Sequence, residues 1–263
     1  MKLRVATYNI HKGVSPLGSQ LRIHALKQAI GMLEADVLFL QEVQGRHDLL
    51  AARYSASWPQ QTQYDFLAGD SHQCAYGMNA VYEHGHHGNA LLSAHPILSA
   101  RNQDMSDHPF EQRGLLHCVV QANGVKIHCY VIHLGLFAGG RRRQCQMLID
   151  AVRASAGKDD PVIVAGDFND WKDNLSGELR RSLGVREVFD GNESPFGWST
   201  LLRELGIRSG RAKPARTFPA AMPWLRLDRI YVRGFDVETA EVMRGQAWSR
   251  LSDHAPIVAT LQF

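Results

Sequence analysis

Cysteine is scarce in this 263-residue sequence: there are only four, and none has the Cys-x-x-Cys spacing typical of a zinc site. Long apolar runs are also missing. No stretch of about 18 uninterrupted apolar residues occurs, which excludes a conventional membrane-spanning helix. The N-terminal residues lack the apolar segment and cleavage site of a signal peptide, so we expect a cytoplasmic protein.

The chain has no strong excess of charge of either sign. Lys plus Arg number 29 and Asp plus Glu number 26, a net charge of +3 that suits a polyanionic substrate without being a signature of nucleic-acid binding. No Pro-, Gly- or Ser-rich linker and no internal repeat divides the chain, and its 44% hydrophobic content is sufficient for a core. We therefore expect residues 1–263 to form one domain, and we expect a monomer.

Short segments rich in Val, Ile, Leu and Tyr predict about a dozen strands. They are residues 2–9, 36–41, 63–68, 78–83, 88–93, 97–103, 114–122, 125–133, 161–167, 227–233, 235–243 and 256–262. Apolar stripes predict helices at 20–34, 45–56, 141–156 and 175–183, and Gly, Pro and Ser predict a loop at 190–225. The pattern favours two sheets packed face to face with helices outside, although periodicity alone also allows a barrel or a mixed open sheet.

Asn123-Gly124 predicts a two-residue hairpin turn that places Cys118 opposite Cys129. We expect both to be buried thiols, because a reducing compartment disfavours disulfides. A disulfide between them would contradict the expected location.

The most informative segment is an apolar strand candidate, 162–166, that leads into Asp167 and Asn169. Residues two apart share a face if the chain stays extended, so these two side chains would point into the same space. Oxygen ligands suit Mg²⁺, and an amide can donate to a phosphate oxygen. Taken alone, the segment could equally be a turn, because Gly-Asp and Asn-Asp commonly form turns.

Polar side chains border four other strand candidates in the same way, which indicates one rim where they converge. They are Asn9, Glu42, His133 and the pair Asp253 and His254.

Six short motifs therefore occur in order along the chain. They are Tyr8-Asn9-Ile10, Gln41-Glu42-Val43, Ile132-His133-Leu134, Gly166-Asp167-Phe168-Asn169, Leu227-Asp228-Arg229-Ile230 and Ser252-Asp253-His254-Ala255-Pro256-Ile257. Together they resemble the endonuclease/exonuclease/phosphatase superfamily, which includes DNase I, AP endonucleases and neutral sphingomyelinases. The resemblance implies an α/β fold, the DNase I-like four-layer αββα sandwich, and a hydrolase acting on phosphoester bonds.

The resemblance also implies a divalent metal, Mg²⁺ or Mn²⁺, with Glu42 as its leading ligand and Asn9 and Asp253 beside it. A carboxylate at the end of a buried strand is costly unless a cation or a donor pairs with it. The alternative is a surface glutamate that opens the next helix.

His254 matches the family's general acid/base, and Asp228 matches the carboxylate that orients it. Asp228 could instead form a salt bridge with Arg226 or Arg229. His133 matches a second histidine of the DNase I and sphingomyelinase branches, although a histidine at a strand end is often only a satisfied polar group.

Asp167 and Asn169 would orient the attacking water or hold the phosphate. Three further residues resemble phosphate-binding positions of the family, and a guanidinium can make two parallel bonds to a phosphate. They are Arg113, Asn89 and Thr217.

The segments that follow Asn9 and Glu42 depart from the AP endonuclease pattern, which places the chain nearer the DNase I and sphingomyelinase branches. We therefore expect a phosphodiesterase acting on nucleic acid. The alternatives are a phosphohydrolase or phospholipase C-like enzyme acting on a lipid headgroup or small phosphoester, and a binding module with an inactive site. The apolar loop at 222–224 could meet a base or a lipid, or serve only packing.

Overall fold

The computed structural model describes residues 2–15, 20–108, 110–190 and 215–263. In chain order the elements are β1 (Lys2–Asn9), the 3-10 turn η1 (His11–Gly13), α1 (Ile23–Met32), β2 (Val37–His47), α2 (Asp48–Arg53), α3 (Gln63–Ala68), β3 (Gln73–Tyr82), β4 (Gly85–Ser93), β5 (Ile97–Asp104), β6 (Gly114–Ala122), β7 (Val125–His133), α4 (Ala138–Ser155), β8 (Val162–Asp167), α5 (Ser176–Leu183), β9 (Arg186–Glu187), β10 (Asp228–Arg233), β11 (Asp236–Val242), α7 (Gln246–Ser249) and β12 (Ile257–Gln262). No helix within the described ranges is both long and apolar enough to cross a membrane.

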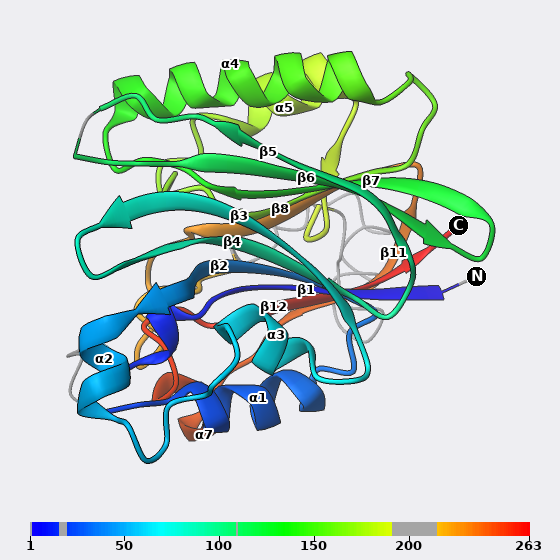
Figure 1. The fold of residues 1–263 in the computed structure, drawn as a ribbon. Coiled ribbons are helices and arrows are strands. Elements are labelled where there is room, and N and C mark those ends of the chain that lie inside the picture. Colours follow the sequence, from blue (N-terminus) through cyan, green and yellow to red (C-terminus); the bar gives the residue numbers. More distant parts are fainter. Residues whose placement is uncertain (1, 16–19, 109, 191–214) are drawn as a thin grey trace.

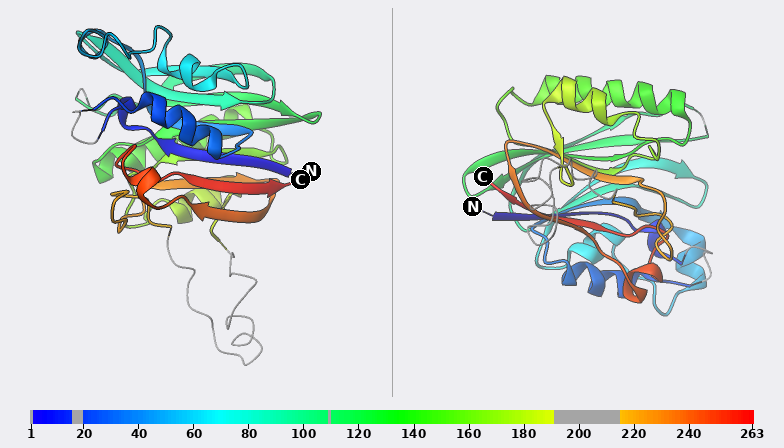
Figure 2. Two further views of the ribbon diagram at one scale, coloured as in Figure 1. Left: turned by 90° about the horizontal axis from the view of Figure 1, so that it is seen from below. Right: turned by 180° about the vertical axis from the view of Figure 1, so that it is seen from behind.

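The strands form two six-stranded mixed sheets, in the orders β11-β12-β1-β2-β4-β3 and β5-β6-β7-β8-β10-β9. The sheets pack face to face. Helices α1, α2, α3 and α7 lie outside the first sheet, and α4 and α5 lie outside the second (Figures 1 and 2). The four-layer αββα sandwich predicted from the sequence is confirmed.

Strand β8 illustrates why four layers form. All six of its residues are buried. Ile163 and Ala165 face the core between the sheets, whereas Val162 and Val164 face the core beneath α4 and α5. A strand that is apolar at consecutive positions needs cover on both faces, which a second sheet and a helix layer provide. Strands β1 and β2 divide in the same way between the central core and the core that α1, α3 and α7 cover.

The hairpin predicted between β6 and β7 is present. Asn123 and Gly124 have φ angles of 49° and 85°, as a tight hairpin turn requires. Cys118 pairs with Cys129 across the ladder, and both are buried free thiols, as predicted.

Some predicted elements were wrong in kind or extent. Residues 63–68, predicted as a strand, form helix α3. Its start is capped by Thr62, whose Oγ1 accepts a hydrogen bond from the Asp65 N–H at 3.3 Å, so a local cap outweighed the strand-like side chains. Strand β3 starts at Gln73, earlier than predicted, and β2 runs on to His47 at the expense of the following helix. Most of the loop predicted at 190–225 lies outside the described residues.

Strand directions bring several chain segments to one edge of the sandwich. Strands β1 and β2 run parallel, as do β7 and β8, so each pair ends at a shared edge. Strands β12 and β10 run antiparallel to β1 and β8, so they begin where those strands end. This edge lies opposite the two chain termini (Figure 1).

Candidate active site

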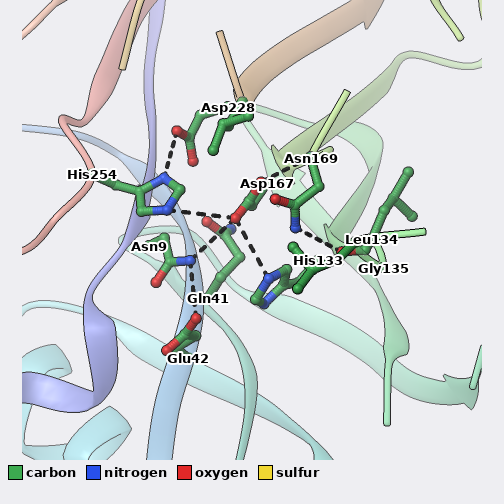
Figure 3. A network of polar contacts seen from close by, with 12 residues as sticks. Asn9, Gln41, Glu42, His133, Leu134, Gly135, Asp167, Asn169, Asp228 and His254 are labelled. Atoms are coloured by element: carbon green, nitrogen blue, oxygen red, sulfur yellow. Dashed lines mark hydrogen bonds and ion pairs between the residues drawn. The ribbon is translucent and has the colours of Figure 1, made fainter. Parts of the chain in front are cut away.

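The edge opposite the termini gathers the polar residues singled out in the sequence. Asn9, His133 and Asp167 end their strands, and Asp228 begins β10 in register with Asp167. Seven of the predicted site residues point toward one another in Figure 3, from both sheets. They are Asn9, Glu42, His133, Asp167, Asn169, Asp228 and His254.

His254 and Asp228 form a hydrogen-bonded pair across the two sheets. His254 Nδ1 lies 2.8 Å from Asp228 Oδ2, and its Nε2 lies 3.7 Å from Asp167 Oδ2. Burial alone would lower the pKa of His254, but the negative charges of Asp228 and Asp167 outweigh it and raise the pKa to about 10. The raised pKa favours the doubly protonated imidazole, whose Nε2 faces Asp167 in the centre of the site.

Asp167 occupies the middle of the network. Its Oδ1 accepts a hydrogen bond from the Asn169 N–H at 2.9 Å, and its Oδ2 accepts one from Asn9 Nδ2 at 3.3 Å. Burial raises its pKa to about 6, although the positive charge of His254 opposes the rise. A carboxyl group with such a pKa can exchange protons with water near neutral pH.

His133 differs from His254 in protonation. Its Nε2 lies 3.5 Å from Asp167 Oδ2. Burial and the positive charge of Arg113 hold its pKa well below the usual value. The pKa values of the two histidines that flank Asp167 are therefore displaced in opposite directions, an arrangement that separates acid from base roles.

Glu42 stands on an irregular segment of β2. The pairing with β4 shifts register between Leu40 and Val43, and Glu42 has a φ of 56°. A bulge re-aims a side chain, and a non-glycine residue in this region is strained, which is common at functional sites. Although burial alone would raise it, the positive charges of Lys12 and His11 lower the pKa of Glu42.

The surroundings of Glu42 fit a divalent cation. Its Oε1 accepts a hydrogen bond from Asn9 Nδ2 at 3.4 Å. Its buried Oε2 makes no hydrogen bond and lies 3.4 Å from the Lys12 ammonium. Asp253 is near enough to act on the pKa of Glu42 and is itself 3.2 Å from His11 Nδ1. Ionised oxygen ligands of this kind are those that hard cations prefer.

A second arrangement of ligand atoms is present within the described ranges. One oxygen or nitrogen from each of Asp167, Asp228 and His254 lies within 4.8 Å of the others, close enough to hold a metal ion. His254 Nδ1 already pairs with Asp228, so a shared proton is enough to explain why these two side chains lie so close together, and no metal ion is needed between them.

The predicted phosphate-binding residues lie on both flanks of the site. Arg113 and Asn89 line a small cavity together with Glu42 and His133. Arg113 donates to the Leu134 carbonyl at 3.3 Å. Asn89 Nδ2 donates to the carbonyls of Gly114 and Val131 in the opposite sheet, at 2.9 and 3.3 Å.

Thr217 is fully buried beside Asp228, on the opposite flank. Its Oγ1 accepts a hydrogen bond from the Asp228 N–H at 3.3 Å, so it fixes the start of β10.

Three residues of the site were not predicted from the sequence as site residues. Lys12 and His11 adopt φ angles of 60° and 45° in η1, which turns them toward Glu42 and Asp253. His87 belongs to strand β4 and lines the cavity with Glu42. Burial lowers the pKa of His87 to about 4. The departure from the AP endonuclease pattern just after Asn9 was the available signal for His11 and Lys12.

Comparison with known proteins agrees with this geometry. The uncharacterized protein YbhP of Escherichia coli (strain K12) is 38% identical over 261 residues, which cover 98% of this chain and 95% of YbhP. The endonuclease/exonuclease/phosphatase from Bacteroides vulgatus superposes with a TM-score of 0.73 at 16% identity, covering 100% of this chain and 99% of that one. The mannosyl-6-phosphatase Bt3783 of Bacteroides thetaiotaomicron superposes with a TM-score of 0.70 at 16% identity, covering 99% and 100%. At these identities the two structures establish the fold alone.

Residues 6–254 match the model of the Endonuclease/Exonuclease/phosphatase family. The match includes every predicted site residue from Asn9 to His254. The chain belongs to the endonuclease/exonuclease/phosphatase family, whose members hydrolyse phosphoester bonds.

Proposed function

We propose that the protein is a phosphodiesterase that depends on Mg²⁺ or Mn²⁺ and acts through one active site within a single domain. The observation that carries the proposal is the convergence of Glu42, Asp167 and the His254–Asp228 pair from two sheets onto one network (Figure 3). Phosphoester hydrolysis needs a neutralised phosphate, an activated water and a protonated leaving oxygen, and this network offers a group for each.

Glu42, Asn9 and Asp253 would hold the metal ion, which supplies positive charge for the phosphate when bound. His254 presents a proton on Nε2 and would give it to the leaving oxygen, while Asp228 fixes the tautomer and stabilises the imidazolium.

Asp167 would accept the proton of the attacking water, which Asn169 helps to orient. His133 would act on the phosphate oxygens. The phosphate-binding groups in this proposal are Arg113, Asn89 and Thr217.

Nucleic acid was the first substrate expected from the sequence, and a lipid headgroup or small phosphoester the second. Close to the site, Lys12 pairs with Glu42, and Arg113, the proposed ligand of the scissile phosphate, also pairs with Glu111, which leaves few cations in the described part of the chain for the further phosphates of a strand. A polynucleotide-binding groove needs a row of cations free to neutralise phosphates. We therefore give preference to the lipid headgroup or small phosphoester, with polynucleotide as the substrate to test against it.

One experiment tests the activity and ranks the substrates. Purified protein with Mg²⁺ or Mn²⁺ is assayed on plasmid, single-stranded DNA, RNA, phospholipid and a chromogenic phosphodiester, in parallel with His254→Ala. We expect turnover that requires the metal and His254, with lipid or small phosphodiester preferred. Turnover of polynucleotide alone would restore nucleic acid as the preferred substrate. Equal activity in His254→Ala would refute the mechanism, and the absence of turnover on every substrate would favour a binding module.

A further inference from the structure

Exposed aromatic side chains gather in the loops around the active site. Phe110, Phe137, Trp171 and Trp224 are 93, 65, 45 and 61% exposed, and Leu136 and Met222 beside them are also exposed. We call these six residues the apolar crescent. The other exposed large hydrophobics among the described residues include no aromatic; they are Met32, Leu49, Met78, Val81 and Leu98.

Contacts connect the residues of one arm of the apolar crescent. The centre of the His108 ring lies 5.3 Å from the centre of the Phe110 ring and 6.3 Å from the centre of the Phe137 ring. Arg141, which is itself buried, donates to the backbone carbonyl of Leu136. The same guanidinium lies 5.0 Å from the ring centre of Trp171.

The other arm runs along the His254 side of the site. The backbone N–H of Trp224 donates to the backbone carbonyl of Phe218 at 2.9 Å, and the centre of the Phe218 ring lies 5.0 Å from the centre of the His254 ring. In the first arm, Trp171 follows Asn169 by two positions. The apolar crescent therefore lies on loops that adjoin residues of the active site.

Basic side chains accompany the apolar crescent. Arg142, Lys172 and Arg216 are exposed, and none of them forms an ion pair with any part of the chain that the structure describes. By contrast, the acid Asp107, near Phe110, is paired with Arg143. Exposed aromatics beside unpaired cations are typical of surfaces that enter the interface of an anionic bilayer.

We propose that the apolar crescent docks the protein on a bilayer that contains anionic phospholipid, so that a headgroup phosphate reaches the site. The docking stands on the surface itself; only the role of the headgroup rests on the proposed function. Leu136 and Met222 offer no ring on which a base could stack, and three unpaired cations are few for a polynucleotide that contacts about 6–10 phosphates.

Vesicle flotation tests the docking. Three forms of the full chain are compared: the wild type, Trp224→Ala and the double variant Phe110→Ala/Phe137→Ala. Each is mixed with vesicles of phosphatidylcholine and phosphatidylglycerol, or with vesicles of phosphatidylcholine alone. We expect flotation with the anionic vesicles, weakened roughly tenfold for each aromatic removed. The double variant Met32→Ala/Leu98→Ala removes exposed apolar side chains outside the apolar crescent and should float like the wild type.

Three outcomes would overturn the docking: absence of flotation, aromatic variants that float like the wild type, or loss of flotation in the control variant. Weaker binding of labelled single-stranded DNA by the aromatic variants, without flotation of any form, would assign the surface to bases instead.

Turnover of a soluble chromogenic phosphodiester separates the two proposals. Flotation without turnover would support the docking proposal and contradict the phosphodiesterase proposal. Turnover without flotation would support the phosphodiesterase and contradict the docking. Unchanged soluble turnover in the aromatic variants would show that they leave the catalytic network intact.

Discussion

Replacing Asp228 by Asn is the sharpest test of the catalytic pair. The substitution keeps the size of the side chain and removes the negative charge that lies 2.8 Å from His254 Nδ1. It also allows the amide to donate where the carboxylate can only accept. We therefore expect an imidazole with a lower pKa and without a fixed tautomer, and a slower reaction.

The size of the effect follows from the geometry. Two unit charges about 4 Å apart at an effective dielectric constant of about 20 interact by about 4 kcal/mol. Asp167, 3.7 Å from the other ring nitrogen, continues to stabilise the imidazolium and offsets part of this loss. A net loss of about 3 kcal/mol corresponds to roughly 10²-fold in kcat, and about 10⁴-fold is the upper range for general acid–base catalysis.

The assay is steady-state hydrolysis of a chromogenic phosphodiester with saturating Mn²⁺ across pH. Because a general acid must be protonated, a lower pKa of His254 shifts the loss of activity at high pH toward lower pH. Asp236→Asn removes a carboxylate whose side chain is 91% exposed and should leave kcat unchanged. Thermal unfolding of each variant checks the fold.

A double variant completes the test. If Asp228 acts through His254, then Asp228→Asn combined with His254→Ala should be no slower than His254→Ala alone. Activity of Asp228→Asn within about threefold of the wild type, or fully additive losses in the double variant, would refute the role given to this pair.

Three further predictions concern the metal and the pH dependence of stability. Glu42→Gln should raise the Mg²⁺ or Mn²⁺ concentration needed for half-maximal activity by at least about tenfold, measured by metal titration, whereas exposed Glu83→Gln should not. Chelation with EDTA should abolish turnover and added Mg²⁺ or Mn²⁺ should restore it; activity that survives chelation would contradict the cofactor. Burial and the positive charge of His128 lower the pKa of His117 to about 4, so the unfolded chain binds a proton first as pH falls. Thermal unfolding should show stability lost from pH about 6.5 down to about 4, and His117→Gln should flatten this profile.

Much of the fold was predictable because its central strands are apolar at consecutive positions. A segment such as 162–166 needs another layer packed against each of its faces, and the polar residues at its end mark where the buried part of the strand stops. The family motifs then supplied which strand ends meet. The helix at 63–68 was missed because it depends on one capping hydroxyl, that of Thr62, rather than on periodicity.

The missed site residues depend on backbone geometry that periodicity does not report. His11 and Lys12 reach the site because both have positive φ angles within a single turn. His87 reaches it because β4 pairs His87 with Gln44, just beyond the irregular segment of β2 that carries Glu42. Register after a bulge is set by tertiary pairing, so a single sequence does not reveal which side chain faces the cavity.

The division of the network between the two sheets ties chemistry to the integrity of the whole sandwich. Asn9, Glu42 and His254 belong to one half and His133, Asp167 and Asp228 to the other, so sliding one half past the other by an ångström would separate proton donor from acceptor. Neither half alone therefore carries the complete network. On gentle heating, turnover should then be lost at a lower temperature than secondary structure, because the two sheets need only separate slightly to disrupt the network.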